Sequence, residues 1–325
     1  MNIAIIGAGA VARTFMELLS SDDSESVENI KVLYIFNSRG GVYDKNGVTS
    51  FGKLTDLPDF TPNLSIHSAD LSGIDLVIDL KSTDMAEAKT DFETCAALLE
   101  KGIHLVSGNK GPVVYGYKKL SDLARKNGVR FMCGCACAAA LPSVIVGLDA
   151  HAGSKISSFE GIVNGTTNYI ISNMEAGVSY EAALKLAQDE GIAEKNPSYD
   201  VEGIDTAIKT VMLANIIWGT ELTLDQVSVT GIDKLSLDDI RRASEKGEKI
   251  KLIGKAVQGE NGTPIVTVAP TSLPKSHLLY HTDEKYKAIV FDSKNMGNVL
   301  ISGASSLKGA AAAILRDVVN IEKFA

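Results

Sequence analysis

The chain has 325 residues, with 32 Lys and Arg against 40 Asp and Glu, a formal charge of −8, and 45% hydrophobic residues. This composition is ordinary for a globular protein with a sizeable core, and at roughly 150 residues per domain the length predicts two domains. The acidic balance, without a Lys/Arg-rich block, argues against nucleic acid or an anionic membrane surface as the main partner and favours small metabolites as ligands.

The sequence carries no pattern typical of a membrane span or a secretory signal. The longest apolar stretch, residues 133–148, is interrupted by Gly134, Pro142 and Gly147, whereas a spanning helix needs about 18 uninterrupted apolar residues. Residues 1–12 lack the basic leading region and the cleavage site of a signal peptide. We therefore expect a cytoplasmic protein.

Three of the four cysteines, Cys133, Cys135 and Cys137, are spaced C-x-C-x-C, which differs from the C-x-x-C spacing usual for zinc. Four cysteines are also too few for a disulfide framework in a chain of this length. We interpret them as small packed side chains in a reducing compartment and predict no metal site.

Residues 1–133 alternate short β-branched runs with longer helical patterns. The predicted strands are residues 1–6, 30–36, 75–80, 103–106 and 129–133, and the predicted helices are residues 10–20, 86–101 and 117–127. This alternation predicts an α/β fold with a doubly wound parallel sheet. Residues 20–29 are expected to form an acidic, serine-rich loop, and residues 39–63 an excursion with little periodicity.

Beyond residue 134 the pattern changes to clustered helices and strands. Helices are predicted at residues 141–151, 167–176, 179–189 and 201–218, and strands at 155–163, 249–257, 264–268, 286–291 and 298–302. Residues 134–303 are therefore expected to form an α+β domain. A last helix, residues 309–321, could dock on either domain, and we expect residues 304–325 to return to the first.

A glycine-rich turn joins the first predicted strand to the first predicted helix. Gly7, Gly9 and Ala12 match G-x-G-x-x-A in the context that the dinucleotide-binding fingerprint requires. Gly7 permits a tight turn, Gly9 lets the backbone approach a pyrophosphate, and Ala10 and Val11 open the helix whose N-terminus faces the phosphates. This turn predicts a Rossmann-type, dinucleotide-binding domain over residues 1–133.

The end of the second predicted strand bears on the choice between NAD and NADP. NAD-specific sites usually place a carboxylate there to bind the ribose 2′-hydroxyl, but this strand ends Asn37-Ser38-Arg39. A 2′-phosphate would instead find Arg39 and two neutral donors, so NADP is the expected cofactor, with NAD possible. The alternative is a solvated surface arginine, and Lys45 could replace Arg39 as the phosphate ligand.

Polar residues follow two later strands, whose ends face the ligand crevice of a doubly wound sheet. Lys81, Ser82 and Thr83 follow the third strand and are expected to contact the cofactor. Lys110 follows the fourth strand in the stretch Ser-Gly-Asn-Lys. A lone lysine at a strand end is more often a solvated charge, so Lys110 needs a second indication.

That indication comes from the second domain, where Asp205 and Lys209 lie four residues apart on a predicted helix. At about 100° per residue they share one flank of the helix, beside its apolar stripe. Such a pair is commonly a surface ion pair that contributes a few tenths of a kcal/mol.

Three segments of the chain together resemble the homoserine dehydrogenases. Residues 164–169, N-G-T-T-N-Y, are similar to a signature of that family. Residues 187–209 resemble its pattern A-x-x-x-G-x-x-E-x-[DN]-P-x-x-D-[VL]-x-G-x-D-x-x-x-K, and residues 107–110 resemble its S-[AG]-N-K strand end. The resemblance covers almost the whole chain in the expected order.

What the resemblance implies is an NAD(P)-dependent interconversion of L-homoserine and L-aspartate 4-semialdehyde. By position, Lys110 and Lys209 would flank the reacting oxygen, Asp205 would lie beside them, and Glu194 and Asp200 would hold the polar end of the substrate. Hydride would pass between the carbinol carbon and the nicotinamide while a lysine moves the hydroxyl proton.

The substrate carboxylate would need amide donors, for which Gly165, Thr166 and Thr167 at a helix start are candidates. The resemblance further implies that residues 134–303 bind the substrate and form a homodimer. It points to the short form without a regulatory domain.

Two segments depart from the family pattern. Residues 133–142 read C-G-C-A-C-A-A-A-L-P where the family has a V-G-A-G-L-P-like turn, often after a glutamate and near a monovalent cation, and the glycine-rich element at residues 302–309 is also altered. Another NAD(P)-dependent oxidoreductase of amino-acid metabolism and a non-catalytic NADP-binding redox sensor are the alternatives. An aspartate-semialdehyde dehydrogenase would need a cysteine nucleophile paired with a histidine, which this pattern does not offer.

Overall fold

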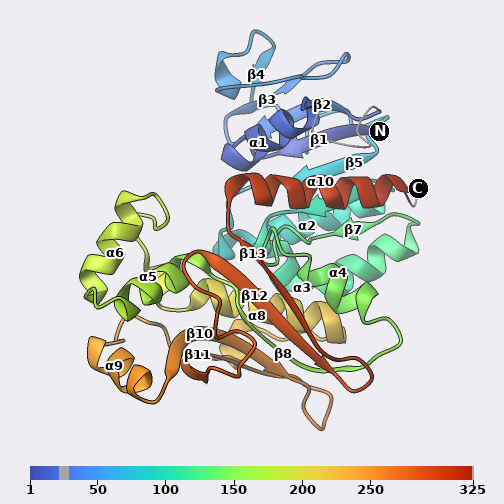
Figure 1. The fold of residues 1–325 in the computed structure, drawn as a ribbon. Coiled ribbons are helices and arrows are strands. Elements are labelled where there is room, and N and C mark those ends of the chain that lie inside the picture. The colour runs from blue at the N-terminus through green and yellow to red at the C-terminus, as the bar shows by residue number, and fades with distance from the viewer. Residues whose placement is uncertain (22–28, 324–325) are drawn as a thin grey trace. The chain divides into compact units, whose positions relative to one another are not determined.

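The computed structural model describes residues 1–21 and 29–323, so most of the predicted 20–29 loop lies outside the described residues. The chain divides into two compact units (Figure 1). Unit 1 contains Met1–Ala140 and the segment from Ser306 onward, and unit 2 contains Leu141–Ser305. The sequence placed these boundaries at 133/134 and 303/304.

Unit 1 is built on a seven-stranded sheet of order β4-β3-β2-β1-β5-β6-β7. Its five parallel strands are β1 (Asn2–Ile6), β2 (Lys31–Asn37), β5 (Leu76–Asp79), β6 (His104–Ser107) and β7 (Phe131–Met132). The predicted α/β fold with a parallel sheet is confirmed. The prediction for residues 39–63 was wrong, because β3 (Gly40–Tyr43) and β4 (Phe60–Pro62) extend the sheet antiparallel to β2.

Helices cover both faces of this sheet, which explains why its strands are apolar throughout. Ile3 and Ile5 of β1 pack into the core beneath α1 (Ala10–Leu19) and α10 (Leu307–Lys323). Ala4 and Ile6 pack into the opposite core, beneath α2 (Ala88–Glu100) and α3 (Lys110–Lys126). In Figure 1, α10 lies along the sheet although it follows unit 2 in the chain.

Helix α3 begins at Lys110, whereas the sequence pattern predicted a start at residue 117. The first turn contains Gly111 and Pro112, and Gly116 interrupts the helix with φ −171° and ψ 51°. A Cβ on Gly116 would fall 2.6 Å from the Phe92 ring, so this close approach of α3 to α2 requires glycine. Proline is tolerated in a first helical turn, but the glycines make the segment resemble a loop.

Unit 2 contains a six-stranded sheet of order β13-β12-β8-β10-β11-β9. The strands are β8 (Ile156–Ile162), β9 (Ser228–Val229), β10 (Glu248–Val257), β11 (Ile265–Pro274), β12 (Tyr286–Ser293) and β13 (Gly297–Ala304). All its pairs are antiparallel except β9 with β11. The α+β character of this part agrees with the sequence pattern.

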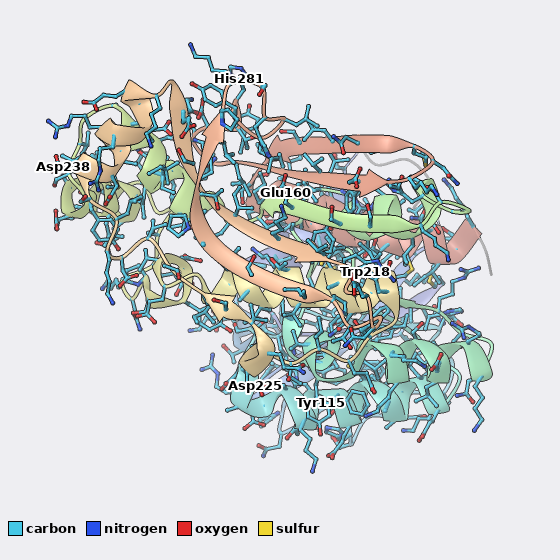
Figure 2. All side chains as sticks on the ribbon, turned by 90° about the horizontal axis from the view of Figure 1, so that it is seen from below. Tyr115, Glu160, Trp218, Asp225, Asp238 and His281 are labelled. Atoms are coloured by element: carbon cyan, nitrogen blue, oxygen red, sulfur yellow. The ribbon has the colours of Figure 1, made fainter. Side chains whose placement is uncertain are left out.

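Helices α5 (Gly165–Glu175), α8 (Ile204–Trp218) and α9 (Leu237–Glu245) pack against β10. At the end of α8, the indole N–H of Trp218 donates to the backbone oxygen of Ile156 at 3.1 Å, and its ring stacks on Phe159 (Figure 2). These contacts fix α8 against the middle strand of the sheet. Helix α6 (Tyr180–Asp189) packs on α5.

Two helix predictions in unit 2 need correction, and the helix α9 was missed. Residues 201–218 form two helices, α7 (Ser198–Val201) and α8, because Gly203 between them takes φ +83°. Residues 141–151 form the short α4 (Ser143–Ile145) followed by a π-helical turn over Val146–Ala150. Helix α9 was not predicted, because its sequence is mostly charged and buries only Ile240 and Ala243.

Among the described residues, no helix is both long enough and apolar enough to cross a membrane.

Candidate active site

A cavity of about 680 Å³ lies beside the turn between β1 and α1. Gly7 takes φ +101°, and a Cβ there would fall 2.5 Å from the backbone oxygen of Leu80, so only glycine fits. Gly9 differs, because nothing lies within 4 Å of the place its Cβ would take. That open space at the N-terminus of α1 is what a dinucleotide pyrophosphate requires. Ala10 and Val11 form the first turn of α1 and are not among the described residues lining the cavity.

The end of β2 forms another wall of this cavity, with Asn37, Ser38 and Arg39 all lining it. The side-chain oxygen of Asn37 accepts hydrogen bonds from the backbone N–H groups of Arg39 at 2.8 Å and Gly40 at 3.1 Å. This turn leaves Arg39 exposed. No Asp or Glu is among the described residues that line the cavity.

Two further cations, Arg13 and Lys53, line the same cavity and were not predicted. Arg13 donates to the backbone oxygen of Ala8 at 3.2 Å, which holds its guanidinium beside the glycine turn. Its position four residues after Gly9 on α1 could have identified it. Lys53 follows a stretch without periodicity and had no such signal, whereas Lys45, in the turn after β3, is not among the described lining residues.

The ends of β5 and β6 bring together the residues predicted after these strands. Lys81 and Ser82 line the cavity, and the Thr83 hydroxyl accepts a hydrogen bond from the backbone N–H of Lys110 at 3.1 Å. The ends of β5 and β6 lie side by side because the strands are parallel and Asp79 pairs with Ser107. Residues 81–83 and Lys110 are therefore neighbours, connected by this hydrogen bond.

A buried polar cluster lies beneath these two strand ends. Asn109 donates to Asp79 at 3.2 Å and to Asp91 at 2.6 Å, and Lys81 forms an ion pair with Asp91. Burial raises the pKa of the Asp79 carboxyl to about 6, although Lys81 opposes the shift. The sequence patterns did not indicate this cluster, because its members come from three separate elements.

Unit 2 holds Lys209 and Asp205 in a buried environment. The Lys209 ammonium donates to Asp205 at 2.6 Å and to the backbone oxygen of Val163 at 3.1 Å. The side chains are 15% and 7% exposed, so the pair is not the solvated surface pair that its i,i+4 spacing alone suggests. The lysine is held at one end of β8 by two acceptors.

Asn164 extends this pair into a network. Its amide nitrogen donates to Asp200 at 2.6 Å and to Asp205 at 2.9 Å, and its oxygen accepts from the backbone N–H of Thr167 at 2.9 Å. Asn164 therefore caps α5 and joins two carboxylates with the same side chain. Burial raises the pKa of Asp200, against the effect of its hydrogen bond with Asn164.

Of the other residues predicted to bind substrate, Gly165, Thr166 and Thr167 lie beside this network and, among the described residues, Glu194 does not contact it. Gly165 and Thr166 begin α5 beside this network, and the Thr166 hydroxyl donates to the backbone oxygen of Ile192 at 3.1 Å. The Thr167 N–H is already bonded to Asn164, so it is a helix-cap group. Glu194 is exposed, and within the described part of the chain its carboxylate has no recorded contact with this network.

Cys95 is buried beside the Asp79–Asp91 cluster, and burial raises the pKa of its thiol well above the usual range. Cys133 and Cys137 are buried and Cys135 is half-buried, and burial raises the pKa of the Cys133 thiol well above its usual range. Within residues 1–21 and 29–323, no three His, Cys, Asp or Glu side chains are grouped so as to hold a metal ion.

Comparisons with known proteins agree with this geometry. The family model for homoserine dehydrogenase matches residues 143–319, and the model for the NAD-binding domain of homoserine dehydrogenase matches residues 7–133. A relative from Pseudomonas canavaninivorans, named NAD(+)-dependent homoserine dehydrogenase, is 32% identical over 100% of this chain and 97% of that protein. A homoserine dehydrogenase from Methanocaldococcus jannaschii is 31% identical over 99% and 98%.

Solved structures give the same result. A crystal structure from Archaeoglobus fulgidus matches with a TM-score of 0.87 and 31% identity over 99% of both chains. A homoserine dehydrogenase from Thiobacillus denitrificans matches with a TM-score of 0.83 and 26% identity over 100% of this chain and 73% of that one. With a cavity at the glycine-rich turn of unit 1, a buried lysine–carboxylate network in unit 2 and these matches over its whole length, the chain belongs to the homoserine dehydrogenase family of NAD(P)-dependent oxidoreductases.

Proposed function

We propose that the protein interconverts L-homoserine and L-aspartate 4-semialdehyde. The observation that carries this proposal is the buried network of Lys209, Asp205, Asn164 and Asp200. A non-catalytic cofactor-binding protein has no need for such a network, because ionised groups are costly to bury unless they are paired. A bound nicotinamide supplies or accepts the hydride, and the residues of the chain handle the proton and the substrate.

Lys209 and Lys110 are the proposed catalytic residues. Asp205 and the backbone oxygen of Val163 orient the Lys209 amine, so that in the reductive direction it can polarise the aldehyde oxygen and give it a proton. In the oxidative direction a lysine takes the hydroxyl proton. Lys110 follows β6 at the crevice edge, where doubly wound folds place their ligands.

The substrate ends require opposite charges. Asp200, with Glu194, is proposed to bind the α-ammonium group, since carboxylates attract it. The backbone N–H groups of Gly165 and Thr166 at the start of α5 are proposed to bind the α-carboxylate. Asn164 keeps Asp200 and Asp205 at fixed positions relative to α5.

An assay with L-homoserine that follows nicotinamide absorbance tests this function. Lys209→Ala should lower turnover by about 10²–10⁴-fold, the usual effect of losing a positioned acid or base, while cofactor affinity changes little. Lys185→Ala, an exposed lysine on α6, is the matched control and should retain activity. Cofactor binding without turnover of either substrate by the wild type would contradict the proposal and favour a redox sensor.

We further propose that NADP is preferred over NAD. Arg13, Arg39 and Lys53 line the cavity where no described carboxylate does, and a charge-assisted bond to a 2′-phosphate contributes about 1.5–3 kcal/mol. The expected preference is therefore about tenfold or more in kcat/KM. The Pseudomonas canavaninivorans relative is named for NAD(+), so the choice needs a direct measurement in this chain.

The comparison of kcat/KM for the two cofactors should include Arg39→Ala, Lys53→Ala and Lys45→Ala. Loss of the preference in the first or second variant would locate the phosphate contact, and Lys45→Ala, outside the described cavity lining, should leave it unchanged. Equal use of NAD and NADP by the wild type would show that the end of β2 does not bind the 2′-phosphate of NADP.

A further inference from the structure

The buried cluster at the ends of β5 and β6 contains more charge than packing alone requires. Asp79 is 2% exposed, Asp91 5% and Asn109 0%. The Lys81 ammonium forms an ion pair with Asp91, whereas Asp79 accepts a hydrogen bond from the Lys81 backbone N–H at 3.1 Å. Apolar residues of similar volume would hold α2 on the sheet at lower cost, because burying a carboxylate carries a large desolvation penalty. The arrangement of these charges therefore calls for a role beyond packing.

Asp91, in the first turn of α2, bonds to two separate segments. One of its oxygens accepts from the Lys81 ammonium, beyond the end of β5, and the other accepts from the Asn109 amide at 2.6 Å, beyond the end of β6. The Asp91 carboxylate therefore bonds to the segment after β5 and to the segment after β6. Lys81, in the first of these segments, lines the proposed cofactor cavity.

Asn109, which Asp91 holds in place, in turn fixes the backbone next to Lys110. Its side-chain oxygen accepts from the backbone N–H of Gly111 at 3.0 Å, and its backbone oxygen accepts from the Ser107 hydroxyl at 2.9 Å. The Lys110 N–H donates to Thr83. The backbone is therefore held on both sides of Lys110, and the starting point of its side chain depends on Asn109 and, through Asn109, on Asp91.

We propose that Asp91 is a positioning residue that holds Lys110 and Lys81 at fixed places at the ends of β5 and β6. The proposal rests on the proposed catalytic function of Lys110. Asp91 is buried, contacts Lys81 directly and acts on Lys110 through Asn109.

Asp91→Ala should lower kcat by roughly 10–100-fold, since a displacement of about 1 Å at a reacting group can cost 10²-fold. KM for homoserine should change little, because the residues proposed to bind the substrate are in unit 2. Asp91→Asn keeps the shape and one acceptor but loses the charge, and should fall between Asp91→Ala and the wild type. It also provides a folded protein if the alanine variant is unstable. Glu93→Gln, an exposed carboxylate on the same helix, should match the wild type.

The double variant with Lys110→Ala separates positioning from general damage. If Asp91 acts through Lys110, the Asp91 substitution has little further effect on kcat once Lys110 is alanine. Two independent, multiplying losses would show a merely structural role, and wild-type kcat in both Asp91 variants would equally overturn the proposal. Near-wild-type turnover of Lys110→Ala alone would instead reject the role of Lys110, and the inference with it.

Discussion

Asn164 satisfies three demands with one amide group. Its nitrogen supplies hydrogen bonds to Asp200 and Asp205, and its oxygen caps α5. Two carboxylates held so close together repel each other, and hydrogen bonds from a shared donor offset part of this repulsion. The network can therefore present a negative charge at a site that is largely closed to water.

Asp200 should make homoserine binding sensitive to mildly acidic pH. Burial raises the pKa of its carboxyl, so protonation removes the charge at a higher pH than for an exposed aspartate. We expect KM for homoserine to rise as the pH falls through this raised pKa. In Asp200→Asn, KM should be high throughout and this pH dependence should disappear. The exposed Asp189→Asn on α6 is the control, and an identical KM profile in Asp200→Asn would contradict the assignment.

At the residue scale, local spacing predicted the Asp205–Lys209 pair, because four residues on a helix bring two side chains together. The partners of Asn164 lie 36 and 41 residues away, and no local pattern encodes contacts at that separation. For the same reason the Asp79–Asp91–Asn109 cluster became visible only in the folded chain.

Helix α10 contacts residues 133–142, one of the two segments in which this chain departs from the family pattern. Asp317 is fully buried and accepts from the backbone N–H of Gly134 at 2.9 Å, and Arg316 donates to the backbone oxygen of Ala140 at 3.4 Å. A Cβ on Gly134 would fall 2.9 Å from the Asp317 carboxylate. The glycine is therefore required for α10 to bind this turn.

The Asp317 carboxylate should make the stability of the protein depend on pH. Burial raises its pKa to about 6 in the folded state, so the folded protein binds this proton more tightly than the unfolded chain does. This group therefore contributes stability as the pH falls below 6, and the contribution is lost as the pH rises through 6. Relative to Asp317→Asn, the wild type should lose about 1 kcal/mol of unfolding free energy between pH 5 and pH 8.

Denaturant unfolding of both proteins at the two pH values measures this difference. Asp79, whose pKa is also raised to about 6, titrates in both proteins and cancels in the comparison. An equal change in both proteins would show that Asp317 does not titrate in this range.

At the element scale, the parallel strands of unit 1 and most helices were predictable because their apolar patterns have the strand or helix period. The failures share a cause, since glycine, proline and charged residues hide an element whose stability comes from tertiary packing. Helix α3 begins in such a segment, and α9 is mostly charged, with a capping box of Ser236 and Asp239 at its start.

At the scale of the molecule, the order of strands and helices was enough to predict both the parallel sheet and the α+β unit, because connection rules allow few topologies. The division of the chain was harder to place. The change of pattern beyond residue 134 lies a few residues before Ala140, where the chain passes from one unit to the other.

We also propose that the protein is a homodimer, as the family resemblance implies. Light scattering should give twice the chain mass of 34.5 kDa at micromolar concentration. Ile265 of β11, 64% exposed, and Leu300 of β13, 42% exposed, are apolar side chains on the sheet of unit 2 that such an association could cover. A monomeric mass over the whole concentration range would contradict the proposal.

The return of α10 to unit 1 has a consequence for synthesis on the ribosome. Ile314 and Val318 cover one face of a sheet whose strands all precede residue 133, and the 165 residues 141–305 are made in between. At a synthesis rate of about 5–20 residues per second, roughly 8–33 s pass between the synthesis of the sheet and that of α10. During this interval α1 is the only one of the two helices that can cover Ile3 and Ile5, while unit 2 can already complete its own core. The unit whose synthesis begins first is therefore the unit whose core is completed last.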